Sequence, residues 1–254
     1  MSFAVSLHST TRALSQAIRL GYLKSNPCAN IVLPRIIPYE MHPLNEAEMK
    51  SFIDSIKGNE YETLFWVDMF TGMRLGEITG LTWDRVNFNT GTIMVDRQLQ
   101  REKKKGGAYI LVSVKNDQPR KLNPAPFVMG LLKEQRAKQA KQRLEAGELW
   151  GCEGGPEDLV FTNALGRHYK HNTITHNVSR IGKRIGIEGL CFHDLRHTYA
   201  VNALRAGDDV KTVQSNLGHA TAAFTLDRYG HYTDDMRRDS AARMEVFAKD
   251  VINL

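Results

Sequence analysis

The sequence predicts a mainly α-helical protein with a small antiparallel β-sheet, an α+β fold. Most of its 254 residues lie in stretches whose apolar side chains recur every three or four positions, which is the spacing of amphipathic helices. Between residues 86 and 122, short runs with turn residues between them read as strands instead. This length allows one large domain, or two smaller ones, with a substantial core.

The apolar pattern places the elements in order along the chain. Asn45 with Glu48 three residues later predicts a capping box at the start of a helix, and Asn89-Thr90-Gly91 predicts a bend between two strands. Residues 158–161 are expected to form a short strand, and residues 101–107 a basic loop. The expected helices cover residues 9–24, 44–57, 61–70, 127–147, 172–187, 193–204, 210–217 and 222–232, with an amphipathic tail over 234–254.

Residues 26–43 separate the first helix from the rest of the chain. They hold four of the eight prolines, a density that disfavours helix and favours an extended connector. We therefore expect residues 1–37 to be a helix with a proline-rich linker, distinct from a large domain over residues 38–254.

Composition limits the class of protein. The formal net charge of +6 favours a polyanionic partner. The three cysteines are far apart without paired metal-ligand spacing, so a reduced, cytoplasmic setting is expected. The first twenty residues contain no long apolar run, which argues against a signal peptide or membrane span.

Side chains suited to phosphodiester chemistry gather in residues 191–232. A guanidinium matches phosphate oxygens and stays charged, so it can neutralise a five-coordinate transition state. Histidines can donate to the same oxygens or move protons near neutrality, and cationic neighbours favour the phenolate of a tyrosine. The residues concerned are His193 and Arg196, which can share one helix face, with His219 and Tyr229.

A second arginine and a proton donor for the departing oxygen are then expected elsewhere. Arg74 follows a Thr-Gly turn and precedes Glu77, and Lys115 lies between segments that read as strands. These residues, followed by His-x-x-Arg, Leu-Gly-His and a tyrosine in a Tyr-x-His context, resemble the catalytic pattern of tyrosine recombinases of the phage integrase family. The chain departs from the family where Asn116 stands in place of the usual threonine.

The resemblance implies a tyrosine recombinase catalytic fold and a covalent transesterification on duplex DNA. Tyr229 would attack the scissile phosphate to give a 3′-phosphotyrosyl enzyme and a free 5′-hydroxyl. The other roles would be phosphate binding by Arg74 and Arg196 with help from His219, protonation of the 5′-oxygen by Lys115, proton transfer assisted by His193, and support of Arg74 by Glu77.

The resemblance also implies partners and context. Residues 1–37 would be the end of a core-binding domain in a shortened chain, and residues 38–254 the catalytic domain. The expected partners are double-stranded DNA, a homotetramer on two synapsed sites (with a monomer in solution left open), and an accessory DNA-bending or excisionase protein. The reaction would integrate or excise a phage or other mobile element in a bacterial cytoplasm. No cofactor or metal is expected, because one phosphodiester replaces another and the sequence has no P-loop or Rossmann glycine motif.

Several alternatives stay open at this point. A type IB topoisomerase would use the same chemistry to relax DNA, and residues 193–217 also fit a non-catalytic helix-turn-helix. A metal-dependent nuclease is a third class of protein, and Cys191, His193 and His197 could be zinc ligands, although HDLRH lacks the glutamate of a metalloprotease motif. Tyr199 and Tyr232 compete with Tyr229 as the nucleophile.

Overall fold

The chain divides into two compact units, Met1–Glu40 and Met41–Leu254. The first unit contains helix α1 (Phe3–Arg19), which begins and ends earlier than the predicted helix over 9–24. The role of this unit stays a prediction. The computed structural model describes residues 3–28, 41–102, 107–114, 118–151, 155–219, 221–229, 244–249 and 251, which leaves most of the proline-rich connector outside the described residues.

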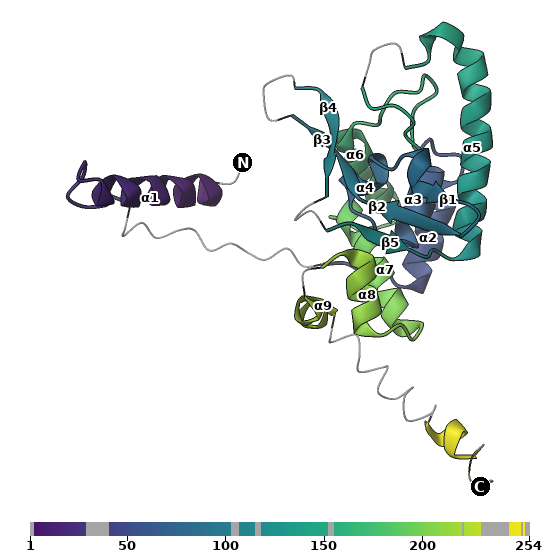
Figure 1. Ribbon diagram of the computed structural model, residues 1–254. Coiled ribbons are helices and arrows are strands. Elements are labelled where there is room, and N and C mark those ends of the chain that lie inside the picture. The colour runs from purple at the N-terminus through teal and green to yellow at the C-terminus, as the bar shows by residue number, and fades with distance from the viewer. Residues whose placement is uncertain are drawn as a thin grey trace. The chain divides into compact units, whose positions relative to one another are not determined.

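The second unit is mainly helical (Figure 1). Its predicted helices are confirmed with boundaries shifted by a few residues, and the predicted capping box is present at Asn45 and Glu48. One short helix after the Thr-Gly turn, α4, was not predicted. The helices are α2 (Glu46–Ile56), α3 (Glu62–Met69), α4 (Leu75–Thr79), α5 (Pro126–Ala146), α6 (His171–Arg184), α7 (Phe192–Arg205), α8 (Val210–Leu217) and α9 (Ala222–Tyr229), with short 3₁₀ helices at Trp83–Arg85 and Gly147–Leu149.

The strands form two small antiparallel sheets, which confirms the α+β fold class. One sheet has the order β1 (Val86–Asn87), β2 (Thr92–Val95), β5 (Arg120–Leu122), and the other pairs β3 (Arg97–Arg101) with β4 (Tyr109–Ser113). The bend predicted at residues 89–91 joins β1 to β2, with Val86 opposite Ile93. The strand β5 pairs with β2 through Ile93 and Leu122, and this pairing brings the end of the sheet region towards the helices that carry the site.

The prediction of a strand over residues 158–161 is wrong. Leu159 makes only an isolated bridge to Thr82. The carbonyl oxygen of Leu159 accepts from Gln139 Nε2 at 2.9 Å, and that of Val160 accepts from Gln135 Nε2 at 3.1 Å. Buried side-chain amides on α5 therefore satisfy carbonyl groups that a neighbouring strand would otherwise bind.

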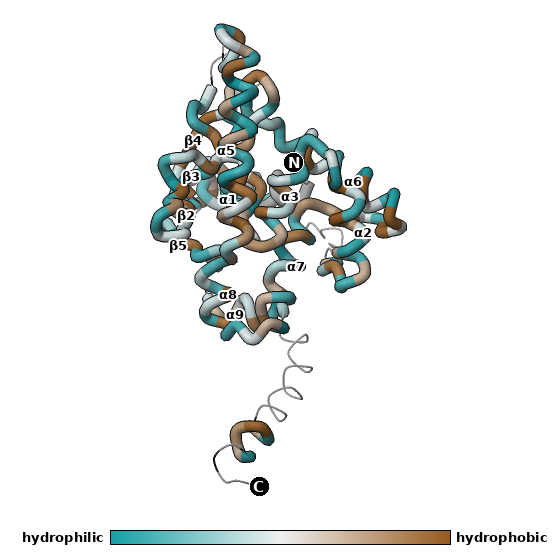
Figure 2. The backbone as a smooth tube through the Cα atoms, turned by 90° about the vertical axis from the view of Figure 1, so that its right-hand side faces the viewer, coloured by the Kyte–Doolittle hydropathy of each residue, from teal (hydrophilic) through white to brown (hydrophobic). Residues whose placement is uncertain are grey.

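Helix α3 lies at the centre of the larger hydrophobic core. It is mostly apolar, with Leu64, Phe65 and Val67 at most 1% exposed, as expected of a helix that is surrounded by other elements. It packs against α5 and α7. The second half of α5, from Lys133, is mostly hydrophilic, and Figure 2 shows this as teal along the helix.

A smaller core forms where α7, α8 and α9 meet. Helix α8 begins at Asp209, whose side chain accepts from the backbone of Lys211 and Thr212. It ends at Gly218, which adopts the left-handed conformation. The nucleophile candidate Tyr229 is the last residue of α9 and packs into this smaller core. No helix within the described ranges is long and apolar enough to cross a membrane.

The C-terminal tail is described at residues 244–249 and 251, which are helical. The predicted apolar face is exposed there, since Met244, Phe247 and Val251 each show about three fifths of their surface (61%, 59% and 61%).

Candidate active site

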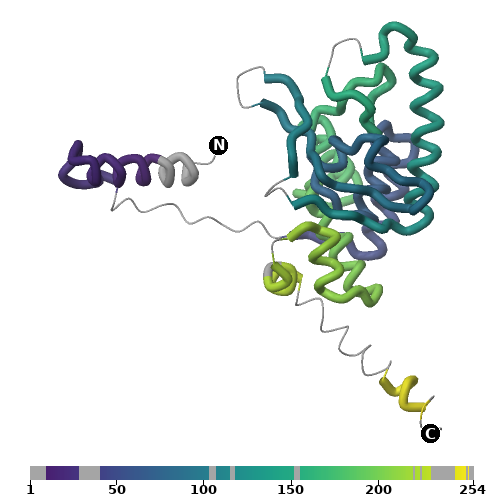
Figure 3. Tube along the Cα trace, in the orientation of Figure 1, coloured from purple at the N-terminus to yellow at the C-terminus, as the bar shows by residue number. Residues whose placement is uncertain are grey.

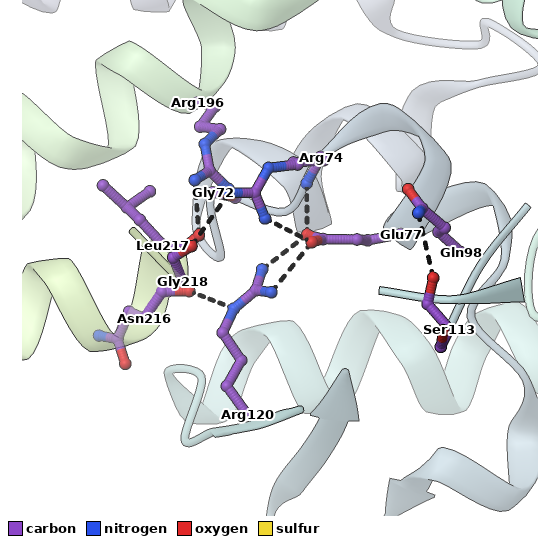
Figure 4. Close-up of polar contacts among 10 residues, drawn as sticks. All are labelled: Gly72, Arg74, Glu77, Gln98, Ser113, Arg120, Arg196, Asn216, Leu217 and Gly218. Carbon is purple, nitrogen blue, oxygen red and sulfur yellow. Dashed lines mark hydrogen bonds and ion pairs between the residues drawn. The ribbon is translucent and has the colours of Figure 1, made fainter. Parts of the chain in front are cut away.

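A buried carboxylate organises two arginines in the centre of the candidate site (Figure 4). Arg120 donates through both terminal nitrogens to Glu77, with distances of 3.0 Å to Oε1 and 2.6 Å to Oε2. Arg74 donates from Nη1 to Oε1 at 2.7 Å and from its backbone nitrogen to Oε2 at 2.8 Å. Glu77 is only 1% exposed, so the carboxylate that binds both guanidinium groups is shielded from solvent, whereas the side chain of Arg74 is 30% exposed.

The charge of Glu77 is maintained by these partners. Burial raises the pKa of Glu77, but the hydrogen bonds and charge of Arg120, followed by those of Arg74, outweigh it and lower the pKa to about 2. Glu77 is therefore ionised at neutral pH. Asp68 behaves oppositely, because burial raises its pKa well above the ordinary range and neither carboxyl oxygen has a hydrogen-bond partner in the described structure.

Arg196 is buried beside this pair, with 1% of its surface exposed. It donates from Nη1 to the carbonyl of Gly72 at 2.6 Å and from Nη2 to the carbonyl of Leu217 at 2.5 Å. Burial, then the positive charge of Arg74, lowers its pKa to about 9, so it remains charged at neutral pH. Arg74, Arg120 and Arg196 thus face one ionised carboxylate, an excess of positive charge suited to an anion.

The two carbonyls belong to segments far apart in the sequence that the fold brings together. Arg74 also donates from Nη2 to the carbonyl of Gly218 at 3.0 Å, and Arg120 donates from Nε to that of Asn216 at 2.7 Å. The end of α8 therefore accepts from all three arginines, and β5 lies beside it (Figures 1 and 3). These contacts position the arginines without using all of their N–H groups.

The Thr-Gly turn before Arg74 requires glycine for two reasons. Gly72 has a φ of 62°, and a Cβ built there would lie 2.4 Å from Cδ1 of Tyr199. Both the left-handed backbone and the aromatic ring would resist a side chain. The motif read from the sequence therefore has a local physical cause.

Replacing Gly72 by Ala is expected to lower the free energy of unfolding by about 2–3 kcal/mol, because positive φ and overpacking both contribute. Urea unfolding of the purified protein measures this change. Gly58→Ala is the matched control, because Gly58 has a similar φ of 72° with nothing within 4 Å of the added Cβ. The control should cost only about 1 kcal/mol, and equal losses in the two variants would contradict the packing argument.

Tyr229 lies close to two histidines, His197 and His219. Its hydroxyl oxygen is 2.6 Å from Nδ1 of His197, and its ring is stacked parallel to that of His219 with centroids 6.5 Å apart. His193 and His197 have ring centroids 4.6 Å apart on one face of α7. Tyr229 is 1% exposed, and burial raises its pKa to about 12 although Arg196 and Arg228 oppose the shift.

The histidines are held in the neutral form. Burial, followed by the charges of Arg196 and Arg74, lowers the pKa of His219 to about 3. Burial is also the first cause that lowers the pKa of His193, with Arg196 next. The Nδ1 of His219 lies 2.9 Å from the hydroxyl of Thr225 on α9, so this histidine links the end of α8 to the helix of Tyr229.

The structure brings together the predicted site residues that it describes. Lys115 lies outside the described residues, as do Tyr232 and the context residue His231. The sequence did not reveal the roles of two residues in the site, Arg120 and His197. Arg120 follows a polar stretch and carries no recognisable motif, and His197 was considered as a possible zinc ligand or a structural residue rather than as a partner of Tyr229. The predicted site residues that lie close together are Arg74, Glu77, His193, Arg196, His219 and Tyr229.

The competing assignments fit this geometry less well. The hydroxyl of Tyr199 accepts from Asn216 Nδ2 at 2.9 Å, and its ring packs over Gly72. His197 contacts Tyr229, and Cys191 caps the N-terminus of α7. Across the described ranges, no three His, Cys, Asp or Glu side chains are placed to hold a metal ion.

Sequence and structure comparisons agree on the class of protein. The profile of the phage integrase family matches residues 42–236. The chain is 28% identical to a XerC-like tyrosine recombinase of Caldanaerobacter subterraneus subsp. tengcongensis, covering 85% of this chain and 58% of the relative. It is also 28% identical to transposase A of transposon Tn554 from Staphylococcus aureus, covering 83% of this chain and 54% of the relative.

The fold has solved counterparts. The Tn1549 transposon integrase in complex with a circular intermediate DNA superposes with a TM-score of 0.74 at 23% identity, over 93% of this chain and 77% of that one. Together with the match of the family profile, this likeness defines the tyrosine recombinase catalytic fold. The chain belongs to the phage integrase family. It spans little more than half the length of the two curated relatives above.

Proposed function

We propose that this chain performs site-specific DNA recombination by cleaving and rejoining duplex DNA through a 3′-phosphotyrosyl intermediate. The observation that carries the proposal is the convergence of Arg74, Arg196 and His219 with Tyr229. Two fixed guanidinium groups provide a preorganised site for the non-bridging oxygens of a phosphodiester. A neutral histidine and a tyrosine adjoin them.

Cleavage would exchange one ester for another. The O–H bond of Tyr229 breaks and its proton passes to His193, while the phenolic oxygen forms a bond to phosphorus. The bond from phosphorus to the 5′-oxygen breaks, and that oxygen takes a proton, a role that the family resemblance assigns to Lys115. Rejoining is the reverse attack by a 5′-hydroxyl. Arg74 and Arg196 stabilise the charge on the five-coordinate phosphorus, and Glu77 holds Arg74 in place.

The burial of Tyr229 sets one condition on this reaction. Because the side chain is 1% exposed, α9 or its surroundings must move before a phosphate on DNA can reach the hydroxyl.

The wider proposal follows the family. The reaction would recombine a phage or other mobile element in a bacterial cytoplasm, with a tetramer bound to two duplex sites. Residues 1–37 would be the end of a core-binding domain, and accessory proteins would be further partners.

A covalent-trapping experiment with randomised DNA tests the proposal and selects the cleavage site at the same time. A pool of nicked duplexes with randomised sequence is incubated with the protein, and DNA that stays bound in SDS is recovered and sequenced. Wild type should give a protein–DNA adduct enriched in one sequence, and Tyr229→Phe should lose it completely, because phenylalanine has no nucleophilic oxygen. Tyr199→Phe is the matched control and should retain the adduct.

Other outcomes would point to other classes of protein. DNA binding without an adduct in either protein would support a non-catalytic DNA-binding module. An adduct without sequence enrichment, together with relaxation of supercoiled plasmid, would support a topoisomerase. An adduct that persists in Tyr229→Phe would move the nucleophile to another tyrosine, and Tyr232→Phe would be tested next.

A further inference from the structure

The contact between His197 and Tyr229 is not used by the mechanism above. Nδ1 of His197 lies 2.6 Å from the hydroxyl oxygen of Tyr229, and the two side chains are 3% and 1% exposed. The other ring nitrogen of His197, Nε2, is buried and has no hydrogen-bond partner in the described structure. Among the described residues, this imidazole therefore has its hydrogen bond with the hydroxyl oxygen of Tyr229, the atom that would attack DNA.

The ionised form of Tyr229 decides which tautomer of His197 can bind it. A neutral imidazole donates from one nitrogen and accepts at the other. While Tyr229 is a phenol, either group can be the donor of this bond, because the hydroxyl also carries a hydrogen. A phenolate oxygen can only accept, so its bond to His197 requires the hydrogen on Nδ1 and leaves Nε2 as an unpartnered acceptor in the described structure. We therefore assign the hydrogen to Nδ1 in the phenolate state.

Burial, helped by the surrounding charges, keeps His197 neutral. Burial is the first cause that lowers its pKa, to about 3, followed by His193, with Arg228 and Arg196 acting in the same direction and Asp194 opposing them. The groups that act on Tyr229 itself are Arg196 on α7 and Arg228 on α9. A neutral N–H donor can approach a phenolate without adding a buried charge, and hydrogen bonds to a charged partner are the stronger kind.

We propose that His197 is a further catalytic residue, whose Nδ1–H donates to the oxygen of Tyr229 and stays bonded to it while the phenolate forms, attacks and later leaves, so that the movement that admits DNA keeps this contact between α7 and α9. This inference rests on the proposed function. No proton is transferred to His197. The hydroxyl proton of Tyr229 passes to His193, as in the mechanism proposed above, and returns by the same route on rejoining. His197 fixes the direction of the oxygen and favours its ionised form.

The test replaces His197 and follows Tyr229 directly. Site-specific incorporation of 3-fluorotyrosine at position 229 allows its ionisation to be followed by ¹⁹F NMR in the free protein. His197→Leu should raise the pKa of this phenol by about one unit or more, because the donor to the phenolate is lost. Covalent cleavage of the DNA selected by trapping should slow roughly tenfold to a hundredfold.

Two conservative variants separate chemistry from folding. An asparagine amide lies near the position of Nδ1, whereas a glutamine amide lies near that of Nε2, so His197→Asn should restore most of the pKa and rate and His197→Gln should not. The pair decides the matter even if His197→Leu fails to fold. His171→Leu is the matched control, since His171 is half-buried and likewise contacts a hydroxyl, that of Thr79, at 2.9 Å.

Three results would overturn the proposal: an unchanged phenol pKa in His197→Leu, equal behaviour of the Asn and Gln variants, or an equal shift in His171→Leu. The NMR measurement needs no DNA, so it is independent of the proposed function. If wild type forms no adduct, the recombination proposal fails while the hydrogen bond is still tested. If wild type cleaves and the phenol pKa does not respond, the role of His197 alone fails.

Discussion

Replacing Arg120 by Met is expected to lower the free energy of unfolding by about 3–5 kcal/mol, because it leaves a buried carboxylate without its main partner. Arg120 makes two hydrogen bonds to Glu77, at 3.0 and 2.6 Å, and the two side chains are 9% and 1% exposed. Arg74 remains as a partner but is about one third exposed. Urea unfolding at neutral pH measures the loss.

The same substitution should change how stability depends on pH. In wild type, the pKa of Glu77 is lowered from about 4.5 to about 2, so its contribution is fully present above pH 4.5 and is lost as pH falls towards 2. This contribution is about 3 kcal/mol at neutral pH. In Arg120→Met, burial dominates and the pKa of Glu77 rises, so the difference in stability between the two proteins should shrink as the pH falls.

A double-mutant cycle with Glu77→Gln completes this test. The double variant removes both charges of this buried pair, so it should be more stable than Arg120→Met alone. The exposed pair of Asp54 and Lys57, at 2.6 Å and 68% exposure each, is the matched control, and Asp54→Asn should cause no comparable loss. If Arg120→Met unfolds with wild-type stability, or if the two substitutions are additive, Arg120 is not the residue that holds Glu77.

The elements that the sequence predicted well are those with a local cause. Asn45 and Glu48 form a capping box that depends on four consecutive residues, and Gly218 ends α8 through its own backbone conformation. The strand predicted over residues 158–161 failed because its carbonyl groups bind Gln135 and Gln139 on α5. No periodicity in a short apolar run reveals that a distant amide replaces a neighbouring strand.

The same distinction applies to the site. His193 and Arg196 were predicted to share a helix face from their spacing, and Arg74 followed from the turn before it. The role of Arg120 could not be read in this way, because its partners Glu77 and Asn216 lie 43 and 96 residues away. Nor could spacing show that His197 is the histidine that contacts Tyr229, since several histidines on this segment were equally plausible partners.

Replacing Arg196 by Lys is expected to slow covalent cleavage roughly a hundredfold to a thousandfold, which is the effect of losing one preorganised donor to a transition state. Arg196 uses one N–H of each terminal nitrogen on the carbonyls of Gly72 and Leu217. Three of its five N–H groups then remain for a phosphate. A lysine ammonium has three donors in all, so it cannot bind both carbonyls and still present a planar pair to the substrate.

This arrangement separates the chemical effect from a loss of structure. Arg196→Lys keeps the charge and one carbonyl contact, so DNA binding should change little while the rate at saturating DNA falls, as expected for an interaction made mainly in the transition state. Arg205→Lys, at an exposed position in the last turn of the same helix, is the matched control and should cleave normally. A variant that binds DNA poorly but cleaves at the wild-type rate once bound would instead make Arg196 a residue of ground-state binding. The two carbonyl contacts would then serve to place it for DNA rather than for the reaction.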